Sequence, residues 1–378
     1  MRLLVLYQAA DPALDQPGYF DGFERMVRDG ELEAHIPVGY LGVASNFGWD
    51  GLWEKVYEIA QDLETDAIFL QFFHTNMPNP LSGISRIRAL PCRPLFFTSL
   101  GDAFGRWVHT VPRSFCVASS ASDLTFLTGM GHIAQQLLRF GSRNLVLMPN
   151  GCCQVRFANS RVDPSARTDF DVCFVGSKMR AHNPLSHFYW CGKRRVEFAN
   201  AFTKRYGARF GLFGKGWEGN LSWGGAIPHR LQQDVYRKAE VVAGGIPLAY
   251  HDYYTSDRVF IATASGVPLI DYYLPGVDML LRDRRDWWLA HNLDEMIALT
   301  DMLLEMPRRT RLELGEQTRH NILAHHTQYH RCQQMIGIVK TLLEARHRGG
   351  RAPLPQLPFL EPASSASQAG EAVIGWQG

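Results

Sequence analysis

One stretch near the C-terminal end constrains the fold most: YTSDRVFIATASGVPLIDYYLP, at residues 254–275. Ser256 precedes a short apolar run, and Gly266 followed by Pro268 ends it, which is the pattern of a helix with a capping start and a glycine stop. The VPLIDYY that follows is apolar and contains β-branched residues, as an interior strand of a parallel sheet does. A helix that leads straight into a buried strand is one unit of an α/β fold.

The same alternation of strands and helices recurs along the chain. Helix candidates have one apolar face, as GLWEKVYEIAQDL at residues 51–63 does, and strand candidates are short apolar runs. Such alternation predicts doubly wound parallel sheets. The expected strands are RLLVLYQ (2–8), DAIFLQFFH (66–74), RPLFFTSLGD (93–102), SFCVASS (114–120), NLVLMPN (144–150), DVCFVGS (171–177), ARFGLFG (208–214), VVAGGIP (241–247), PLIDYY (268–273) and DMLLR (278–282).

The length of 378 residues suits two domains of ordinary size. The alternation breaks after Asn150, where a polar segment without apolar period follows, and this segment is interpreted as a linker. Near the end, the composition turns to Gly, Pro, Ser and Ala, which predicts disorder. The expected parts are an N-terminal domain at 1–150, a linker at 151–169, a C-terminal domain at 170–310, a helical segment at 311–347 that returns towards the first domain, and a tail at 348–378.

Composition excludes several classes of protein. The formal net charge is only +2, so DNA or another polyanion would have to bind at a local patch rather than to the chain as a whole. The seven cysteines are odd in number and irregularly spaced, without a CxxC pair, which indicates a reducing compartment. No uncharged apolar run approaches the length of a membrane span, and the apolar stretch MRLLVLYQAAD is too short and turns acidic too soon for us to expect a signal sequence. We therefore expect a cytoplasmic protein.

Three predicted strand-end loops each carry a positively charged side chain beside glycine or hydroxyl groups. Arg258 lies at a helix start, where a guanidinium and free backbone N–H groups suit a diphosphate. Because the carboxyl ends of parallel strands meet at one edge of the sheet, the loops should form one anion site, although each pattern alone also fits an ordinary turn or surface cation. The residues expected there are Gly176, Ser177, Lys178, Arg180, Lys215, Gly216, Trp217, Ser256, Asp257 and Arg258.

The motif R-V-F-x-A-x-A-S-G-V-P-L from Arg258, then PGVD and a helix ending near HTQYHR, resembles the C-terminal part of CgeB-type glycosyltransferases, which are similar to the family-1 type. DVCFVGS, RFGLFGKGW and a helix containing Tyr236 follow the family's order. The resemblance implies the GT-B fold, an α/β architecture of two Rossmann-like domains facing a cleft, with Tyr236 in the donor site. Where relatives carry a glutamate that holds the donor ribose, this chain has Ile261; Asp257 is the nearest carboxylate.

A base for the acceptor hydroxyl is expected from the first domain. Asp102 follows a buried strand and Gly101, and His74 ends another strand, so both are candidate catalytic residues at the cleft. The alternatives are a helix cap for Asp102 and a histidine bonded to nearby backbone for His74. A retaining enzyme would need no such base.

No metal site is expected. Asp169 and Asp171 form a D-x-D pattern that leads into a strand instead of following one, and His326 with His330 lacks a third ligand. Arg258, Lys215 and Lys178 supply positive charge for a leaving diphosphate without a metal ion.

The sequence thus predicts a metal-independent GT-B glycosyltransferase that needs no cofactor and uses a nucleotide-sugar donor, expected to be UDP-linked. The acceptor is a hydroxyl of a surface polymer, a natural product or a modified DNA base. Two alternatives stay open: a nucleotide-sugar epimerase of the same fold, and a non-catalytic sugar- or nucleic-acid-binding remnant, to which the replacement of the family's glutamate by Ile261 points.

Overall fold

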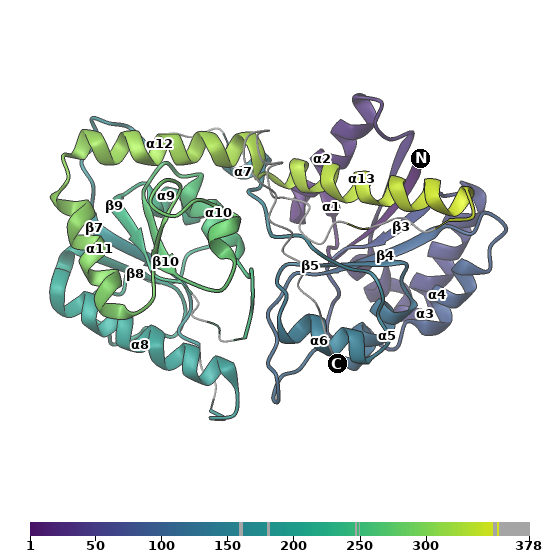
Figure 1. Ribbon diagram of the computed structural model, residues 1–378, viewed down its shortest axis with the longest axis horizontal. Helices are drawn as coiled ribbons and strands as arrows, with labels where there is room; N and C mark the ends of the chain where they lie inside the picture. Colours follow the sequence, from purple (N-terminus) through teal and green to yellow (C-terminus); the bar gives the residue numbers. More distant parts are fainter. Residues whose placement is uncertain (159–161, 180–181, 246–247, 249, 351–353, 355–378) are drawn as a thin grey trace.

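The N-terminal half forms a parallel sheet (Figure 1). Its strand order is β2-β1-β3-β4-β5-β6. The computed structural model describes residues 1–158, 162–179, 182–245, 248, 250–350 and 354. The strands are β1 (Arg2–Tyr7), β2 (Ala34–Gly39), β3 (Ala67–Leu70), β4 (Leu95–Leu100), β5 (Leu124–Leu127) and β6 (Leu145–Leu147). The helices around them are α1 (Pro12–Asp15), α2 (Pro17–Arg28), α3 (Tyr40–Asp62), α4 (Leu81–Arg88), α5 (Arg113–Ala121) and α6 (His132–Arg139).

The C-terminal half forms a second parallel sheet, with order β11-β10-β9-β7-β8. Its strands are β7 (Phe170–Val175), β8 (Phe210–Phe213), β9 (Ala239–Ala243), β10 (Leu269–Tyr272) and β11 (Trp288–Ala290). The α-helices from the connecting segment onward are α7 (Gln154–Phe157), α8 (His187–Tyr206), α9 (Gln232–Tyr236), α10 (Asp257–Thr263), α11 (Leu293–Glu305), α12 (Arg308–His325) and α13 (Gln328–His347). Short 3-10 turns are η1 (Gly207–Arg209), η2 (His229–Leu231) and η3 (Val277–Met279).

Each sheet is buried on both faces, as parallel sheets with helical crossovers are. In the first domain, Leu4 and Ile68 pack on one face, whereas Leu3 and Val5 pack on the other. All four residues of β3 are buried, which explains why this strand reads as a continuous apolar run. The predicted fold class, α/β with two doubly wound parallel sheets, is therefore confirmed.

The last helix belongs to the core of the first domain. After α12 has covered the second domain, the chain turns at His326 and Thr327, and α13 runs along the first domain beside α2 (Figure 1). Its side chains Met335, Ile336 and Val339 join the buried cluster on β1, β3, β4 and β5. Two helices thus occupy the segment that the sequence suggested as one long helical stretch.

Two predicted strands were wrong, and one strand was not predicted. SFCVASS is the helix α5, whose buried Phe115, Cys116 and Ser119 follow helical spacing, and the strand comes directly after it as β5. DMLLR begins within the short turn η3, and the edge strand is β11 instead. β2 was overlooked because AHIPVG contains a proline, which an edge strand tolerates. Most of the predicted tail, residues 351–353 and 355–378, lies outside the described residues. None of the helices in the described part of the chain is long and apolar enough to cross a membrane.

Candidate functional site

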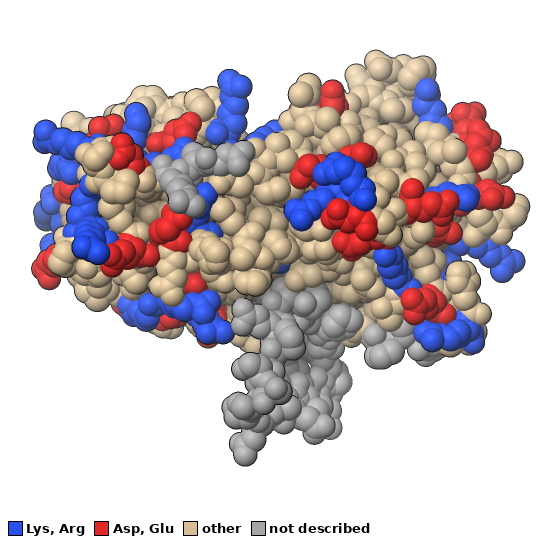
Figure 2. Space-filling view, turned by 90° about the horizontal axis from the view of Figure 1, so that it is seen from above, with Lys and Arg blue, Asp and Glu red and all other residues tan. Residues whose placement is uncertain are grey.

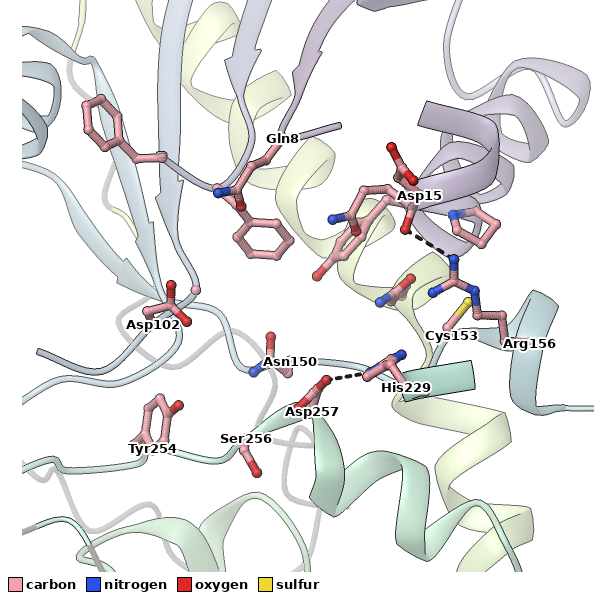
Figure 3. Close-up of a pocket in the computed structure, with 17 residues that line it drawn as sticks. Gln8, Asp15, Asp102, Asn150, Cys153, Arg156, His229, Tyr254, Ser256 and Asp257 are labelled. Atoms are coloured by element: carbon pink, nitrogen blue, oxygen red, sulfur yellow. Dashed lines mark hydrogen bonds and ion pairs between the residues drawn. The ribbon is translucent and has the colours of Figure 1, made fainter. Parts of the chain in front are cut away.

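A cleft of about 470 Å³ lies between the two domains (Figure 3). Its N-terminal wall comes from loops that follow strands of the first sheet: Gln8 after β1, Phe72 after β3 and Asp102 after β4. The opposite wall includes Ser256 and Asp257 at the start of α10. The residues that line it are Gln8, Asp15, Gln16, Pro17, Tyr19, Phe72, Phe73, Gly101, Asp102, Asn150, Cys153, Arg156, His229, Tyr254, Ser256, Asp257 and Gln328.

Asp102 points into this cleft from the first domain (Figure 3). Gly101 precedes it and packs tightly, since a Cβ atom at that position would lie 2.8 Å from the ring of Phe72, which would have to shift. Solvent reaches the carboxylate, yet both walls surround it, and this desolvation raises the pKa of Asp102; the negative charge of Asp257 raises it further. A carboxylate with a raised pKa is a better proton acceptor at the pH of most enzymes.

His74 does not line the cleft, although it follows the neighbouring strand β3. Its Nδ1 accepts a hydrogen bond of 3.2 Å from the backbone N–H of Asn76. The backbone at this strand end is held from the other side by Tyr40, whose hydroxyl donates to the carbonyl of Phe72 at 2.6 Å. The structure therefore places Asp102 at the cleft and gives His74 a local contact within its own loop.

Asp257 and His229 form an ion pair on the C-terminal wall, with Oδ2 and Nε2 2.9 Å apart (Figure 3). Burial alone would raise the pKa of Asp257, but the hydrogen bond from His229 and the charges of His229 and Arg258 hold it below its ordinary value. His229 was not predicted as a site residue. It lies in η2, more than twenty residues before its partner in the sequence, and no local motif joins the two.

Arg258 leaves the start of α10 and donates from Nη1 to the carbonyl of Val175, the last residue of β7, at 2.8 Å. A side chain at Gly176 would collide with this guanidinium, so the glycine makes room for it. Tyr236 and Ser256 line the same small pocket as Arg258. Two of the three strand-end loops that the sequence suggested for an anion, those of Gly176 and Arg258, meet here.

A second arginine, Arg195, reaches the same place from α8. Its Nη1 donates to the carbonyl of Ser177 at 2.8 Å and its Nε to the carbonyl of Gly245 at 3.3 Å. Its Nη2 is buried and has no hydrogen-bond partner among the described residues. Burial, followed by the charge of Arg258, lowers the pKa of Arg195 to about 10. The run KRR at residues 193–195, in the middle of α8, was the sequence feature that could have indicated Arg195. Three adjacent residues point to different faces of a helix, however, so the run does not show which of them faces the site.

Asp271 is a half-buried carboxylate near these two arginines, at the end of β10. Gly245 packs so tightly against it that a side chain there would overlap the carboxylate. Burial raises the pKa of Asp271 to about 7, although the N–H of Tyr272 and the charges of Arg258 and Arg195 act in the opposite direction. An aspartate within the apolar run PLIDYY was the sequence signal for this residue.

The third loop, which contains Lys215 and Trp217, is joined to the loop of Gly176. The indole Nε1 of Trp217 donates to the carbonyl of Gly176 at 2.7 Å, and the N–H of Lys178 donates to the carbonyl of Lys215 at 2.9 Å. The ammonium of Lys178 lies 5.9 Å from the centre of the Trp217 ring, and Lys215 is exposed. Gly216 takes a positive φ of 89° in this turn. The predicted Arg180 lies outside the described residues.

Ile261 occupies the position where the family resemblance leads one to expect a glutamate. Its side chain is only 2% exposed and belongs to the apolar core of the second domain. A carboxylate is therefore not available at this turn of α10, and Asp257, one turn earlier, is engaged by His229.

The residues considered as metal ligands have structural partners. Asp171 accepts hydrogen bonds from Arg209, at 2.9 Å from Nε and 2.6 Å from Nη2, and Asp169 lies 3.7 Å from Lys238. His326 contacts the buried Arg331, with Nδ1 2.9 Å from Nη2. These contacts indicate that the three side chains stabilise the fold.

Comparison with known proteins agrees with the architecture. Residues 194–337, which include α8 from its middle, Arg258 and part of α13, match the model of a family described as glycosyl transferase-like. Comparison with curated proteins gives no match.

Solved structures with the same fold share little sequence with this chain. HepE from Anabaena, solved in complex with UDP and glucose, has a TM-score of 0.55 at 12% identity, covering 90% of this chain and 100% of its own. Sucrose-phosphate synthase from Thermosynechococcus elongatus has a TM-score of 0.59 at 12% identity, covering 91% and 100%. A glycosyltransferase from Rickettsia africae has a TM-score of 0.53 at 11% identity, covering 89% and 97%. The chain thus has the GT-B fold, and residues 194–337 are similar to a glycosyl transferase-like family.

Proposed function

We propose that the protein is a glycosyltransferase that moves a sugar from a nucleotide-sugar donor to an acceptor hydroxyl. One observation carries the proposal: the carboxyl ends of both sheets border one cleft, with a carboxylate on the first wall and arginines behind the second. Ligands of open α/β sheets bind at such strand ends. The match of residues 194–337 to a glycosyl transferase-like family supports the same function for the second domain.

The donor diphosphate is proposed to bind where Arg258 and Arg195 converge on Gly176. Both guanidinium groups are held by backbone carbonyls, so they are oriented before any ligand arrives, and a preorganised cation stabilises the charge that develops on a leaving diphosphate. Lys178 and Lys215 add charge at the joined loops. A UDP-linked donor is proposed because HepE, which shares the fold, was solved with UDP and with UDP-glucose.

Asp102 is proposed as the base of an inverting transfer. The acceptor hydroxyl gives its proton to the Asp102 carboxylate while its oxygen forms the new bond to the anomeric carbon, and the bond from that carbon to the diphosphate oxygen breaks. The negative charge that leaves with the diphosphate is met by Arg258 and Arg195. In this scheme the arginines do the work of a metal ion, so the enzyme is proposed to be metal-independent and to need no further cofactor.

The acceptor is proposed to be a hydroxyl of a surface polymer or natural product, as the similarity of the Arg258 motif to CgeB-type enzymes suggests. A modified DNA base is the weaker choice. Figure 2 shows Lys and Arg interspersed with Asp and Glu on the face that carries α12 and α13, so the described residues of this face offer no continuous basic surface to a duplex.

A panel of nucleotide sugars tests the function. We expect the protein to bind UDP-linked sugars, seen as a rise in melting temperature, and to release UDP slowly when water serves as acceptor. Asp102→Asn should bind the same sugars and release less UDP. Conversion of the donor into its epimer without UDP release would instead show an epimerase. Failure to bind any member of the panel would contradict a donor site.

A further inference from the structure

Three histidines from distant parts of the sequence meet at the boundary of the two domains. None of them lines the cleft, although the ring of His251 lies 5.8 Å from that of Tyr254, which does. His132 is the first residue of α6, His187 is the first residue of α8, and His251 lies between β9 and α10. One ligand atom of each lies within 4.8 Å of the others. We propose that these three imidazoles bind one transition-metal ion of the zinc type, which links the two domains.

The side-chain chemistry fits such an ion. Imidazole nitrogen is a preferred ligand of Zn²⁺, and three protein ligands with a fourth position open to solvent are a common arrangement. Tetrahedral ligation at about 2.0–2.1 Å places the nitrogens roughly 3.3–3.4 Å apart, so the three rings need to close by a short rotation of their side chains. His251 is fully buried and His187 is 9% exposed, so burial already limits the motion of both rings.

One nitrogen of His187 lacks a hydrogen-bond partner in the described part of the chain. Its Nδ1 is buried and has no hydrogen-bond partner among the described residues. A buried polar atom without a partner costs free energy. Binding of a metal ion by the imidazole of His187, either as it stands or with its ring rotated by half a turn, removes that cost. Its ring lies 5.4 Å from that of His132 and 6.1 Å from that of His251, measured between centres.

His132 has hydrogen-bond acceptors at both nitrogens, Tyr250 O at 2.8 Å from Nδ1 and Phe104 O at 2.7 Å from Nε2. When one nitrogen turns to a metal ion, the other keeps its N–H bonded to a carbonyl. This is the outer-shell contact that most ligating histidines make, and it fixes the ring for the ion. The carboxylate of Asp252 lies beside Gly131, the residue before His132, because its Oδ2 would be 3.3 Å from a Cβ atom built at Gly131.

The position of the cluster explains what the ion would do. Residues 130–132 of the first domain pair with residues 250–252 of the second, through Met130 N to Asp252 O at 2.8 Å and His132 N to Tyr250 O at 3.3 Å. In Figure 1, α6 and α8 lie on the side of the molecule opposite to α12 and α13. The ion would therefore fasten the domains at the edge away from the α12–α13 crossing.

Titration of the metal-stripped full chain with Co²⁺ alone tests the site. We expect one Co²⁺ per chain, with the visible absorption of a tetrahedral ion, and displacement by Zn²⁺. His187→Ala and His251→Ala should each weaken binding by more than the roughly 10–100-fold that the loss of an outer-shell partner costs. His320→Ala is the matched control, because His320 is an exposed histidine of α12 outside the cluster, and it should bind as the unaltered protein does.

Because loss of a buried histidine can also impair folding, a second measurement uses the unaltered protein. X-ray absorption of the zinc-loaded chain should show three imidazole nitrogens at about 2.0–2.1 Å. Fewer than three imidazoles would overturn the proposal, and so would undiminished binding of Co²⁺ by folded His187→Ala and His251→Ala. Neither readout depends on glycosyl transfer.

Discussion

Gly176 shows how a single small residue shapes the proposed donor site. Its carbonyl accepts from Trp217, its missing side chain makes room for Arg258, and a side chain at the neighbouring Gly214 would collide with it. Three loops from distant parts of the second domain can meet only because this position carries no Cβ. The sequence showed a glycine after a strand, but it did not show that an arginine some eighty residues later requires it.

Arg258→Ala should weaken binding of a nucleoside diphosphate. Charge-assisted hydrogen bonds contribute about 1.5–3 kcal/mol each, so the dissociation constant should rise roughly 10- to 150-fold. Calorimetry with UDP measures this. Arg309→Ala is the control, since that arginine is 91% exposed on α12 and should not alter affinity. Unchanged affinity in Arg258→Ala would remove Arg258 from the donor site.

Asp102→Asn should lower kcat by about 10²–10⁴ while donor binding stays normal, because the amide cannot accept the proton of the acceptor. His74→Ala should leave kcat nearly unchanged, since the imidazole contacts the backbone of Asn76 and does not line the cleft. Steady-state kinetics with an acceptor measure both variants. If His74→Ala abolishes turnover and Asp102→Asn does not, the roles are reversed; if both turn over normally, the base lies elsewhere or the transfer is retaining.

Asp271 should make stability depend on pH. Its pKa is about 7 in the folded protein against an ordinary value of 3.8, so unfolding releases a proton between these values. The free energy of unfolding should therefore fall as the pH rises from about 4 to 7, by up to about 1.4 kcal/mol for each pH unit. Asp271→Asn keeps the shape and should lack this dependence. Urea titrations from pH 4.5 to 7.5 compare the two proteins, and parallel curves would show that Asp271 does not titrate in this range.

At the scale of elements, the sequence predicted strands with long apolar runs and helices with one apolar face. β3, β4, β7 and β8 were found because sheets buried on both faces require such runs. SFCVASS was mistaken because a short apolar segment has the same composition in a buried helix as in a strand. β2 was missed because edge strands are held by backbone pairing, here to β1, and this leaves little trace in the residue pattern.

The candidate site was partly predictable for a related reason. Arg258, Lys178, Lys215 and Asp102 follow strands, and a parallel sheet brings its strand ends together. Arg195 and Asp271 lie inside elements, and His229 lies in a connecting turn, so their proximity depends on tertiary packing that no local pattern records. The three-histidine cluster was invisible for the same reason, since its members are more than fifty residues apart in sequence.

The helix α13 should stabilise the first domain although it follows the second in sequence. Ile336 is 1% exposed and packs in the cluster that covers β1, β3, β4 and β5. Ile336→Ala should lower the free energy of unfolding by about 2–5 kcal/mol, and hydrogen exchange should show the loss in strands β1–β5 more than in β7–β11. Thr341→Ala, at an exposed site of the same helix, should change stability by less than about 0.5 kcal/mol. Equal loss of protection in both sheets would show that the domains unfold as one unit.

At the scale of the whole molecule, removal of metal ions tests whether glycosyl transfer requires one. Arg258, Arg195 and the lysines provide the charge at the proposed diphosphate site, so turnover should survive excess EDTA. Release of nucleotide diphosphate before and after chelation measures this. Complete loss of turnover that Mg²⁺ or Mn²⁺ restores would show that a metal ion acts in the chemical step, contrary to the proposed mechanism.

The return of α13 also has a consequence for biosynthesis. A ribosome delivers the N-terminal sheet first, but the helix that covers much of one of its faces is delivered after both sheets have been made. Until then, apolar side chains such as Leu3, Val5 and Phe97 are exposed to solvent on the side that α13 later covers. The second domain, whose strands and helices α8–α12 are contiguous in sequence, can close its core earlier. We therefore expect the second domain to complete its core before the first domain does. Until α13 has been made, part of the core of the first domain stays exposed to chaperones.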